Sequence, residues 1–491
     1  MIRNIKYALI LILSVIIYSA EAQNSQVLYN MNLPQNHLLN PALRSTNSVY
    51  LGLPGFSGVN INANNNFINF SDVFIKGQTD SILTFLHPDY DTDKFLKKIK
   101  DKNSIEPELT VPLFGLGFSA GKDLYIFLDI NERIDGNVVL PGDIIKLALK
   151  GNEQFLGSKI DLSSLRGDIK YYREVGLGFS KNFTNKLRIG VKGKLLYGIT
   201  AASVDNRSLG ITVNDDYTHT LDADLMVNFS APLNVNMSAD NKVESLIFDD
   251  SRFDNNAGIL DFLLNTKNVG FGFDLGATYN VTDNLIISAA VTDIGYIKWK
   301  TDVTNLQAES RFEFSGLNML NVFNGTMTFD SLANEMLDSL QNSFIVNDTK
   351  TPFTTYLPYG VTFGGNYNLT KSFSVGLLSY SRIIGNQIRE ALTLSANLNL
   401  GNALSLSLAY TAANHRYDNL GIGLGLRAGF LQFYTVVDRI PVTWNKINMD
   451  NGSPLMLPAN WNTINARIGF NFVFGNKIKR KDDKPMVLVE Y

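Results

Sequence analysis

The 491-residue chain contains no cysteine, only four histidines, and charged residues at only 18% of its positions. Without cysteine, disulfides, thiolate metal sites, a cysteine nucleophile and an acylated-cysteine lipid anchor are excluded. The net charge of −3 offers no basic surface that would favour nucleic acid as a partner. Beyond the N-terminus no apolar run reaches 18 residues, so the mature chain can enter a membrane only as strands.

The first 22 residues have the three parts of a secretory signal. Arg3 and Lys6 form a basic start, residues 8–17 form an apolar core, and the small-residue sequence A-E-A ends at Ala22. The alternative is a buried N-terminal helix. We expect cleavage after Ala22 and export to the outer membrane of a Gram-negative cell.

Most of the remaining chain alternates between apolar and small or polar residues. In the stretch 285–292, Leu285, Ile287 and Val291 alternate with Ser288 and Thr292. Six pairs of such runs are joined by a few turn residues, which is the pattern of a tight hairpin. The connections between these hairpins are mostly long. Short turns at one end and long loops at the other are typical of a bacterial outer-membrane barrel.

The predicted fold is all-β: a transmembrane, up-and-down antiparallel β-barrel of about 14 strands. It comprises a first strand at 49–62, hairpins at 107–134, 169–203, 267–299, 355–384, 388–413 and 418–440, and a last strand at 460–474. Segment 217–231 also resembles a strand but breaks the up-down order. We place it in the loop 204–266, as half of an extended hairpin; with a partner in the wall it would give 16 strands. Helical insertions are expected in the outer loops at 80–100, 143–149 and 330–344.

The alternation also predicts which side chains face lipid. One face of each strand is apolar and almost free of charge, as in Phe271, Phe273 and Leu275. This suits lipid, because Arg or Lys at mid-bilayer costs about 2–4 kcal/mol. A soluble periplasmic β-protein, the alternative, would carry more charge on its solvent face. The opposite face is rich in Gly and Ser and carries the charges that we expect to line the lumen: Glu174, Arg188, Lys192, Lys194, Asp274 and Arg467.

Two interpretations of the lumen charges remain open. Arg188, Lys192 and Lys194 share one face of one strand. They are either balanced by Glu174 and Asp274 on other strands, or they form a basic stripe that binds an anionic plug or solute.

The barrel, residues 48–475, is expected to have a short segment at each end. Residues 23–47 form either a plug in the Gly-rich lumen, with Asn40, Pro41 and Ala42 as candidate plug residues, or a periplasmic lead into the first strand. Residues 476–491 form a periplasmic tail. The tail ends either in disorder or in a partner-binding strand, whose candidate residues are Met486, Val487, Leu488, Val489 and Tyr491.

The start of the barrel carries a family resemblance. Asn40-Pro41-Ala42, followed by V-Y-L-G-L-P-G from Val49, resembles the start of a family of uncharacterised outer-membrane barrels of Bacteroidota, and the resemblance extends to Phe474. More distantly, the organisation is similar to FadL-type transporters of hydrophobic compounds and to PorV-type barrels of the type IX secretion system. These similarities imply 14 strands and an N-terminal segment.

No sequence motif indicates catalysis. The chain has neither H-E-x-x-H nor G-x-S-x-G, and its histidines are dispersed, so we predict no enzyme, no cofactor and no metal. The first expectation is an accessory or binding subunit of a larger outer-membrane complex for protein assembly, secretion or surface machinery. The alternative is a FadL-like conduit for a small hydrophobic or amphipathic solute. The expected partners are outer-membrane lipid and other outer-membrane or periplasmic proteins.

Overall fold

A computed structural model describes residues 26–76, 82–84, 91–151, 153–216, 218–239, 242–314, 345–413, 416–441, 443–448, 454–459 and 462–475. The signal sequence, the tail residues 486–491 and the predicted helix at 330–344 lie outside these ranges. Among the described residues, no helix is both long and apolar enough to cross a membrane.

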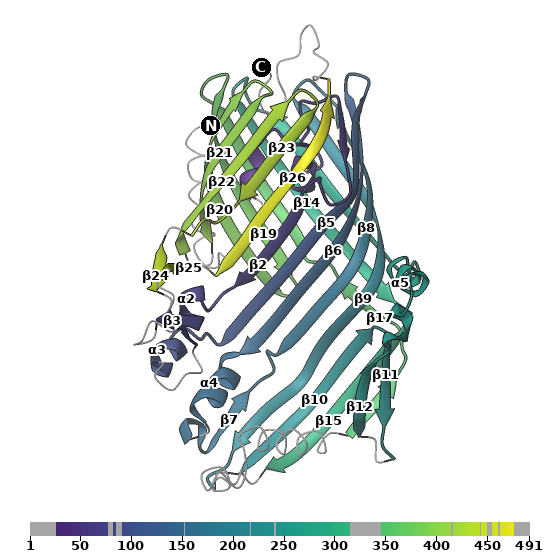
Figure 1. Ribbon diagram of the computed structural model, residues 1–491, viewed down its shortest axis with the longest axis vertical. Helices are drawn as coiled ribbons and strands as arrows, with labels where there is room; N and C mark the ends of the chain where they lie inside the picture. Colours follow the sequence, from purple (N-terminus) through teal and green to yellow (C-terminus); the bar gives the residue numbers. More distant parts are fainter. Residues whose placement is uncertain are drawn as a thin grey trace.

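The fold is a closed antiparallel barrel of 14 strands, as the alternation predicts (Figure 1). Two of the 14 strands are interrupted, β1 with β2 and β17 with β18. The wall consists of β1 (Val49–Gly52) with β2 (Val59–Asn65), β5 (Lys102–Ala120), β6 (Leu124–Pro141), β8 (Arg166–Asn182), β9 (Leu187–Val213), β13 (Asn268–Asn280), β14 (Leu285–Trp299), β17 (Phe353–Tyr356) with β18 (Tyr359–Asn368), β19 (Phe373–Ile384), β20 (Gln387–Leu400), β21 (Leu404–Ala413), β22 (Arg416–Ala428), β23 (Leu431–Val437) and β26 (Thr463–Phe474).

The barrel closes between its first and last strands. Tyr50 pairs with Val473, and Asn60 pairs with Arg467. The first strand is not continuous as predicted: it breaks at 53–58, where Pro54 lacks a backbone donor and Gly58 adopts φ 127°. Only glycine suits position 58, since a Cβ there would lie 1.9 Å from the Tyr434 hydroxyl.

The six tight turns lie together at one end of the barrel, which we call the turn end (Figure 1). The opposite loop end carries an outer sheet. Here β9 continues past the wall and pairs with β7 (Ser158–Asp161) and β10 (His219–Ser230), and β10 pairs with β15 (Val303–Phe314), which pairs with β16 (Ile345–Thr349). Within the predicted segment 217–231, β10 is therefore half of an extended hairpin with β9, and the 16-strand alternative is wrong.

Smaller elements complete the loop end. They are α2 (Phe70–Val73), β3 (Phe74–Lys76) with β4 (Ile82–Thr84), α3 (Thr92–Leu96), α4 (Gly142–Lys150), η4 (Glu153–Phe155), β11 (Leu233–Met237) with β12 (Val243–Phe248), η5 (Asp250–Phe253), α5 (Asn256–Leu263), and β24 (Trp444–Asn448) with β25 (Pro454–Pro458). The helix predicted at 143–149 is present as α4 and ends at Gly151, at φ 76°. In the described part of 80–100, only Thr92–Leu96 is helical.

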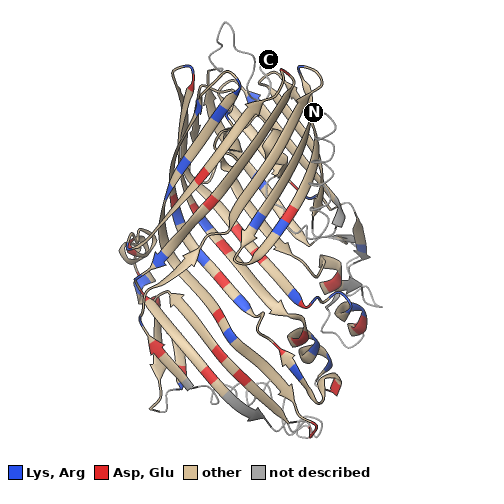
Figure 2. Ribbon diagram, turned by 180° about the vertical axis from the view of Figure 1, so that it is seen from behind, with Lys and Arg blue, Asp and Glu red and all other residues tan. Residues whose placement is uncertain are grey.

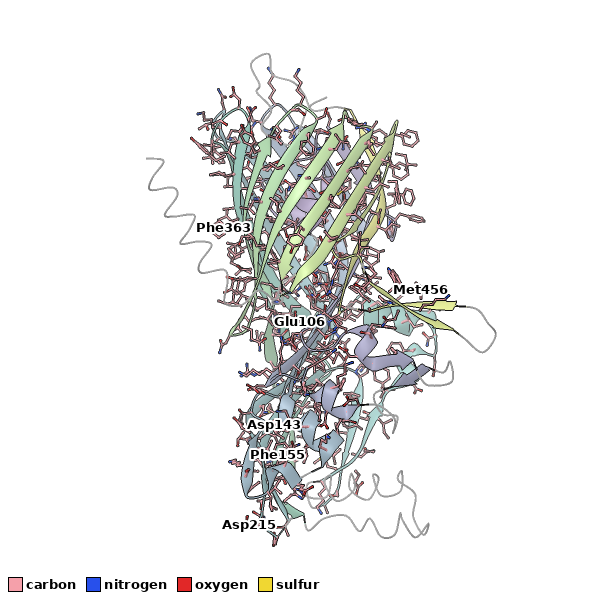
Figure 3. The ribbon with its side chains drawn as sticks, turned by 90° about the vertical axis from the view of Figure 1, so that its left-hand side faces the viewer. Glu106, Asp143, Phe155, Asp215, Phe363 and Met456 are labelled. Carbon is pink, nitrogen blue, oxygen red and sulfur yellow. The ribbon has the colours of Figure 1, made fainter. Side chains whose placement is uncertain are left out.

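Apolar side chains cover the outer surface of the barrel. Phe271, Leu177 and Leu408 are all exposed there, and Phe363 projects outward in Figure 3. The alternate positions, such as Lys192 and Asp274, are buried inside. The strands therefore have the two faces that the sequence pattern predicts, with the apolar face outward.

Candidate functional site

The interior of the barrel is occupied by the chain's own N-terminal segment, residues 26–47, which we call the plug. It contains two short 3-10 helices, η2 (Gln26–Asn30) and η3 (Pro34–Leu38), and is drawn in purple within the barrel in Figure 1. Every plug residue except the half-buried Leu38 is buried. From Ser48, whose N–H donates to the Phe474 carbonyl, the chain passes directly into β1.

Glycines in the wall allow the plug to approach closely. A Cβ added at Gly190 would lie 2.2 Å from the Pro41 carbonyl carbon, and one at Gly276 would lie 2.0 Å from Asn40 Oδ1. Gly364 stands in the same relation to Tyr29. The Gly-rich inner face of the strands is therefore the surface on which the plug packs.

The plug packs with apolar side chains on one side of the barrel. Seven plug residues share a buried cluster with wall side chains of β19, β21 and β23: Val27, Leu28, Tyr29, Met31, Leu33, Leu39 and Leu43 against Leu378, Ala409, Tyr434 and Val436. Burial of each such side chain stabilises by roughly 1.5–3 kcal/mol. The seven together give roughly 10–20 kcal/mol, an upper bound because unfolded chains already bury some apolar surface. Withdrawal of the whole plug would therefore expose a large apolar surface of both the plug and the wall.

Hydrogen bonds fix the register of the plug. The Val27 N–H donates to Asp438 Oδ1 at 2.8 Å, and Asn30 Nδ2 donates to Ser395 Oγ at 2.7 Å. The amides of Gln35 and Asn471 bond reciprocally, at 2.7 and 3.0 Å. These bonds tie the plug to β20, to β26 and to the residue that follows β23, all late in the sequence.

The candidate plug residues Asn40, Pro41 and Ala42 lie deep in the lumen. Asn40 Nδ2 is 3.3 Å from the Ala289 carbonyl, and Asn40 Oδ1 accepts from the Ala42 N–H at 2.8 Å. This internal bond closes a tight turn over residues 40–42, of the kind that Asn side chains form. The tripeptide shapes the plug where it touches β13 and β14.

Buried ion pairs line the other side of the lumen. Lys192 Nζ lies 2.9 Å from Glu174 and 3.1 Å from Asp129, and Lys194 Nζ lies 2.7 Å from Asp274. Two further residues extend this network, which we call the lumen charge cluster. Arg133 bonds Glu174 and Asp293, both at 2.9 Å, and Asp293 also pairs with Lys194 at 2.5 Å.

One plug side chain joins the lumen charge cluster. His37 Nε2 lies 2.8 Å from Asp129 Oδ2, and its Nδ1 lies 2.5 Å from the Pro34 carbonyl oxygen. Both neighbours are acceptors, so the imidazole bonds both when each ring nitrogen carries a proton. His37 thereby connects the conformation of η3 to the charges of the wall.

Of the six predicted lumen residues, the structure brings four into the lumen charge cluster: Glu174, Lys192, Lys194 and Asp274. Arg188 lies nearer the turn end, where it donates to Ser180 Oγ at 3.0 Å. Arg467, on β26, lines the same cavity as the cluster. The contacts of Lys192 and Lys194 match the interpretation in which basic residues are balanced by carboxylates of other strands.

Several lumen residues were not predicted. Asp129, Arg133 and Asp135 occupy alternate positions of β6, a periodicity that is visible in the sequence L-D-I-N-E-R-I-D. Asp293 gives no such signal. It has φ 64°, and the β13–β14 pairing shifts register between Phe273 and Leu275, so simple alternation fails there.

Two ion pairs cross the lumen near its loop end. Arg382 of β19 bonds Glu108 of β5 at 2.7 Å, and Arg389 of β20 bonds Glu106 of β5 at 2.6 Å. We call these two pairs the crossbar; Glu106 lies near the middle of the molecule in Figure 3. In the strand order of the wall, β5 and β19 are on opposite sides. A circular 14-strand barrel with ~40° tilt would be roughly 28 Å across, far more than one Arg–Glu pair spans, so the wall is narrowed here.

A cavity of about 70 Å³ lies between the plug and the charged wall. Leu28, Leu38 and Leu39 line it from the plug, and the wall contributes Arg133 and Arg467, whose Nε atoms make no hydrogen bond to described residues. The space admits a few water molecules but is about half of the roughly 150 Å³ cavity that holds benzene. In this conformation the cavity is too small for an aromatic hydrocarbon.

The described residues include no group of three or more His, Asp or Glu side chains that could hold a metal ion. Figure 2 shows charged residues distributed along the strands in the middle of the barrel, where lysines and arginines alternate with carboxylates. Ion pairs and packed apolar side chains occupy the described interior. The absence of a cofactor stays a prediction.

A family of unknown function, DUF5723, matches residues 41–438. The chain belongs to the DUF5723 family. The match covers the wall from β1 to β23 and begins at Pro41, inside the plug. The Bacteroidota origin suggested by the N-terminal stretch stays a prediction. Comparison with curated protein sequences finds no match for this DUF5723 barrel.

Among solved structures, the DUF5723 barrel is similar to the toluene transporter TbuX of Ralstonia pickettii, at 11% identity and a TM-score of 0.38, over 93% of this chain and 99% of that one. It is also similar to a FadL homologue of Pseudomonas aeruginosa, at 11% identity and a TM-score of 0.40, over 94% and 98%. The toluene transporter TodX of Pseudomonas putida matches at 9% identity and a TM-score of 0.37, over 93% and 97%. Scores this low carry no inference about function.

Proposed function

We propose that this protein is an outer-membrane barrel that serves as a gated conduit for a small hydrophobic or amphipathic solute, with the plug as its gate. This is the alternative that the sequence left open, and the protein acts without catalysis. The apolar outer surface supports the location in a membrane. The loop end faces the cell exterior and the turn end faces the periplasm, since outer-membrane barrels have long outer loops and short inner turns.

The observation that carries this proposal is the two-sided lumen. Leu378, Ala409 and Val436 give one side an apolar surface, and the lumen charge cluster gives the other side a charged surface. In this structure the plug contacts both surfaces. Its leucines pack on the apolar surface, and His37 bonds Asp129 of the charged surface. A solute that replaced these contacts would need one apolar and one polar side.

The gate opens by a local rearrangement of the plug. Complete withdrawal would forfeit contacts worth roughly 10–20 kcal/mol, so the moving part is the stretch around η3 that borders the cavity. Leu38, the one half-buried plug residue, and Leu39 line this cavity. Movement of this stretch would enlarge the cavity towards the crossbar, whose Glu108 also lines it.

A reversible cross-link tests the gate. In Asn40→Cys/Gly276→Cys, the Cβ of position 276 would lie 2.8 Å from the present Asn40 Cγ. The Cβ of residue 40 is one carbon–carbon bond, about 1.5 Å, from its Cγ. The two Cβ atoms therefore lie within about 4.3 Å of each other, a separation that a disulfide can bridge. Since the chain has no other cysteine, oxidation locks the plug to β13 alone. Uptake of the apolar dye N-phenyl-1-naphthylamine by intact Gram-negative cells should fall on oxidation and recover with reductant.

The two single-cysteine variants are the controls, and a heat-dependent shift on gels verifies that each barrel is folded. Dye uptake that is equal in the oxidised and reduced double variant would reject the plug as a gate. Deletion of residues 26–44 provides a second variant, which should raise uptake above the unlocked protein. A folded deletion variant with no change in uptake would also reject the proposal.

The accessory-subunit role keeps one specific observation in its favour. The outer sheet of β7, β9, β10, β15 and β16 extends beyond the wall and offers a large surface at the loop end. A conduit does not need such a sheet. Affinity purification from native membranes followed by mass spectrometry should recover a stoichiometric partner if this role is the main one.

A further inference from the structure

An excursion on the outside of the barrel carries five large, exposed apolar side chains: Leu246, Ile247, Phe248, Leu260 and Leu264. It comprises residues 231–267, between β10 and β13, and contains the β11–β12 hairpin, η5 and α5. Figure 1 shows α5 beside the barrel wall, near β9 and β17, rather than over the lumen. The excursion therefore neither closes the lumen nor contributes to the conduit.

The helix α5 has one face packed and one face free. Phe262 contacts Phe253 edge-on at 5.2 Å, and Phe253 stacks on Phe248 at 5.6 Å between ring centroids. Leu260 and Leu264 are four positions apart, which places them on one face of the helix and its C-cap, and they are 54% and 56% exposed. Two leucines thus point away from the aromatic stack.

The position of α5 along the barrel matches the outer edge of the apolar belt. Leu264 lies four positions before Asn268, the first residue of β13, and Phe271 of β13 is exposed on the outer surface. Phe271 pairs with Tyr296, which pairs with Tyr356, and these three side chains are 55%, 41% and 74% exposed. Such an aromatic row is typical of a membrane–water interface. The leucines of α5 therefore continue the belt at its loop-end border.

Polar contacts hold α5 at this height. The Arg252 guanidinium bonds both carboxylate oxygens of Asp302 at 2.9 Å, and Asn265 Nδ2 donates to Thr301 Oγ1 at 3.1 Å. Thr301 and Asp302 lie in the connection that follows β14. The excursion is thus tied to the wall strand that carries Tyr296.

We infer that α5 is an interfacial anchor: it lies in the membrane plane at the loop end of the barrel, and Leu260 and Leu264 enter the acyl chains of the adjacent leaflet. A helix with apolar residues on one face binds an interface in this way. Continuity with the apolar belt favours lipid over a protein partner. The anchor fixes the depth of the barrel and braces the base of the outer sheet.

Site-directed spin labelling tests this inference, and the absence of native cysteine makes each variant a single thiol. Leu260→Cys and Leu264→Cys are labelled with a nitroxide in nanodiscs that hold this protein and phospholipid within a cysteine-free scaffold protein. Leu177→Cys, on the lipid-facing wall, is the membrane control. Asp215→Cys, at the distal tip of the outer sheet in Figure 3, is the water control.

At positions 260 and 264, the nitroxide should collide with oxygen severalfold more often than with a water-soluble nickel chelate, as at position 177. At position 215 the ratio should be reversed. Labels at 260 and 264 that behave like the label at 215 would overturn the inference. So would dipolar broadening that disappears on dilution with unlabelled protein, because a second copy would then cover the leucines.

Discussion

Replacing Lys192 with methionine tests how strongly the lumen charge cluster stabilises the closed barrel. The Lys192 side chain is 1% exposed, and its ammonium lies between the carboxylates of Glu174 and Asp129. Methionine preserves most of the side-chain volume but leaves both carboxylates without this cation. Removing one partner of a buried ion pair typically costs about 3–5 kcal/mol, because the remaining charge is uncompensated.

For Lys192→Met we expect a loss at the lower end of this range of about 3–5 kcal/mol, because both carboxylates keep a second partner. Glu174 retains Arg133 at 2.9 Å, and Asp129 retains His37 at 2.8 Å. We therefore expect Lys192→Met to lower the free energy of unfolding by about 3 kcal/mol. The double variant Lys192→Met/Glu174→Gln should lose less stability than the two single variants lose in total. We expect the difference between the two values to be roughly 1–3 kcal/mol.

Reversible urea unfolding in lipid vesicles measures these free energies, with the folded fraction read from the heat-dependent gel shift. Lys186→Met, at an exposed position in the turn between β8 and β9, is the matched control and should change stability by less than about 0.5 kcal/mol. Equal effects at Lys192 and Lys186 would refute the reasoning. They would mean that water screens the lumen as it screens the surface.

Four shorter tests follow. Gly364→Val should lower the free energy of unfolding by about 1–3 kcal/mol, because its Cβ would overlap the Tyr29 hydroxyl. Gly365→Val, the control, should lower it by less than about 0.5 kcal/mol. Equal losses in urea unfolding would contradict the close approach of Tyr29 to Gly364. An epitope tag within 320–345 should be labelled on intact cells; labelling only after permeabilisation would reverse the predicted orientation. Planar-bilayer recordings of the intact protein should show little steady conductance, and a large open channel would contradict the plug. Truncation after Asn476 should leave membrane insertion intact but lose a partner in pull-downs; recovery of the same partners would leave the tail without a binding role.

The architecture was predictable because barrel strands obey a local rule. Alternation at positions such as Phe271, Phe273 and Leu275 depends only on the backbone repeat and on one lipid-facing surface, so each strand can be read by itself. The turn and loop lengths then order the strands. The rule fails where the backbone departs from it, as at the break around Pro54 and Gly58.

The interior was less predictable because its contacts join distant parts of the chain. The inward position of Lys192 follows from alternation, but its pairing with Asp129 depends on how the strands twist and narrow around the plug. The crossbar pair Arg382–Glu108 is separated by 274 positions in sequence. Many carboxylates face the lumen, and no local sequence pattern indicates which of them pairs with a given cation. The inward position of Asp293 does not follow from alternation at all, because the backbone is irregular there.

The path of the plug has a consequence for assembly. Its first residues bind late strands: the Val27 N–H bonds Asp438, and Gly421 and Gly423 receive Val27 and Met31. The plug, which is synthesised before every strand of the wall, therefore finds its binding surface only after the last strands have formed. Since the plug continues directly into β1, which seals against β26, closure of the barrel and seating of the plug are coupled. An unsealed intermediate would expose both the seam and the apolar face of the plug, and such exposed surfaces make an intermediate prone to aggregation.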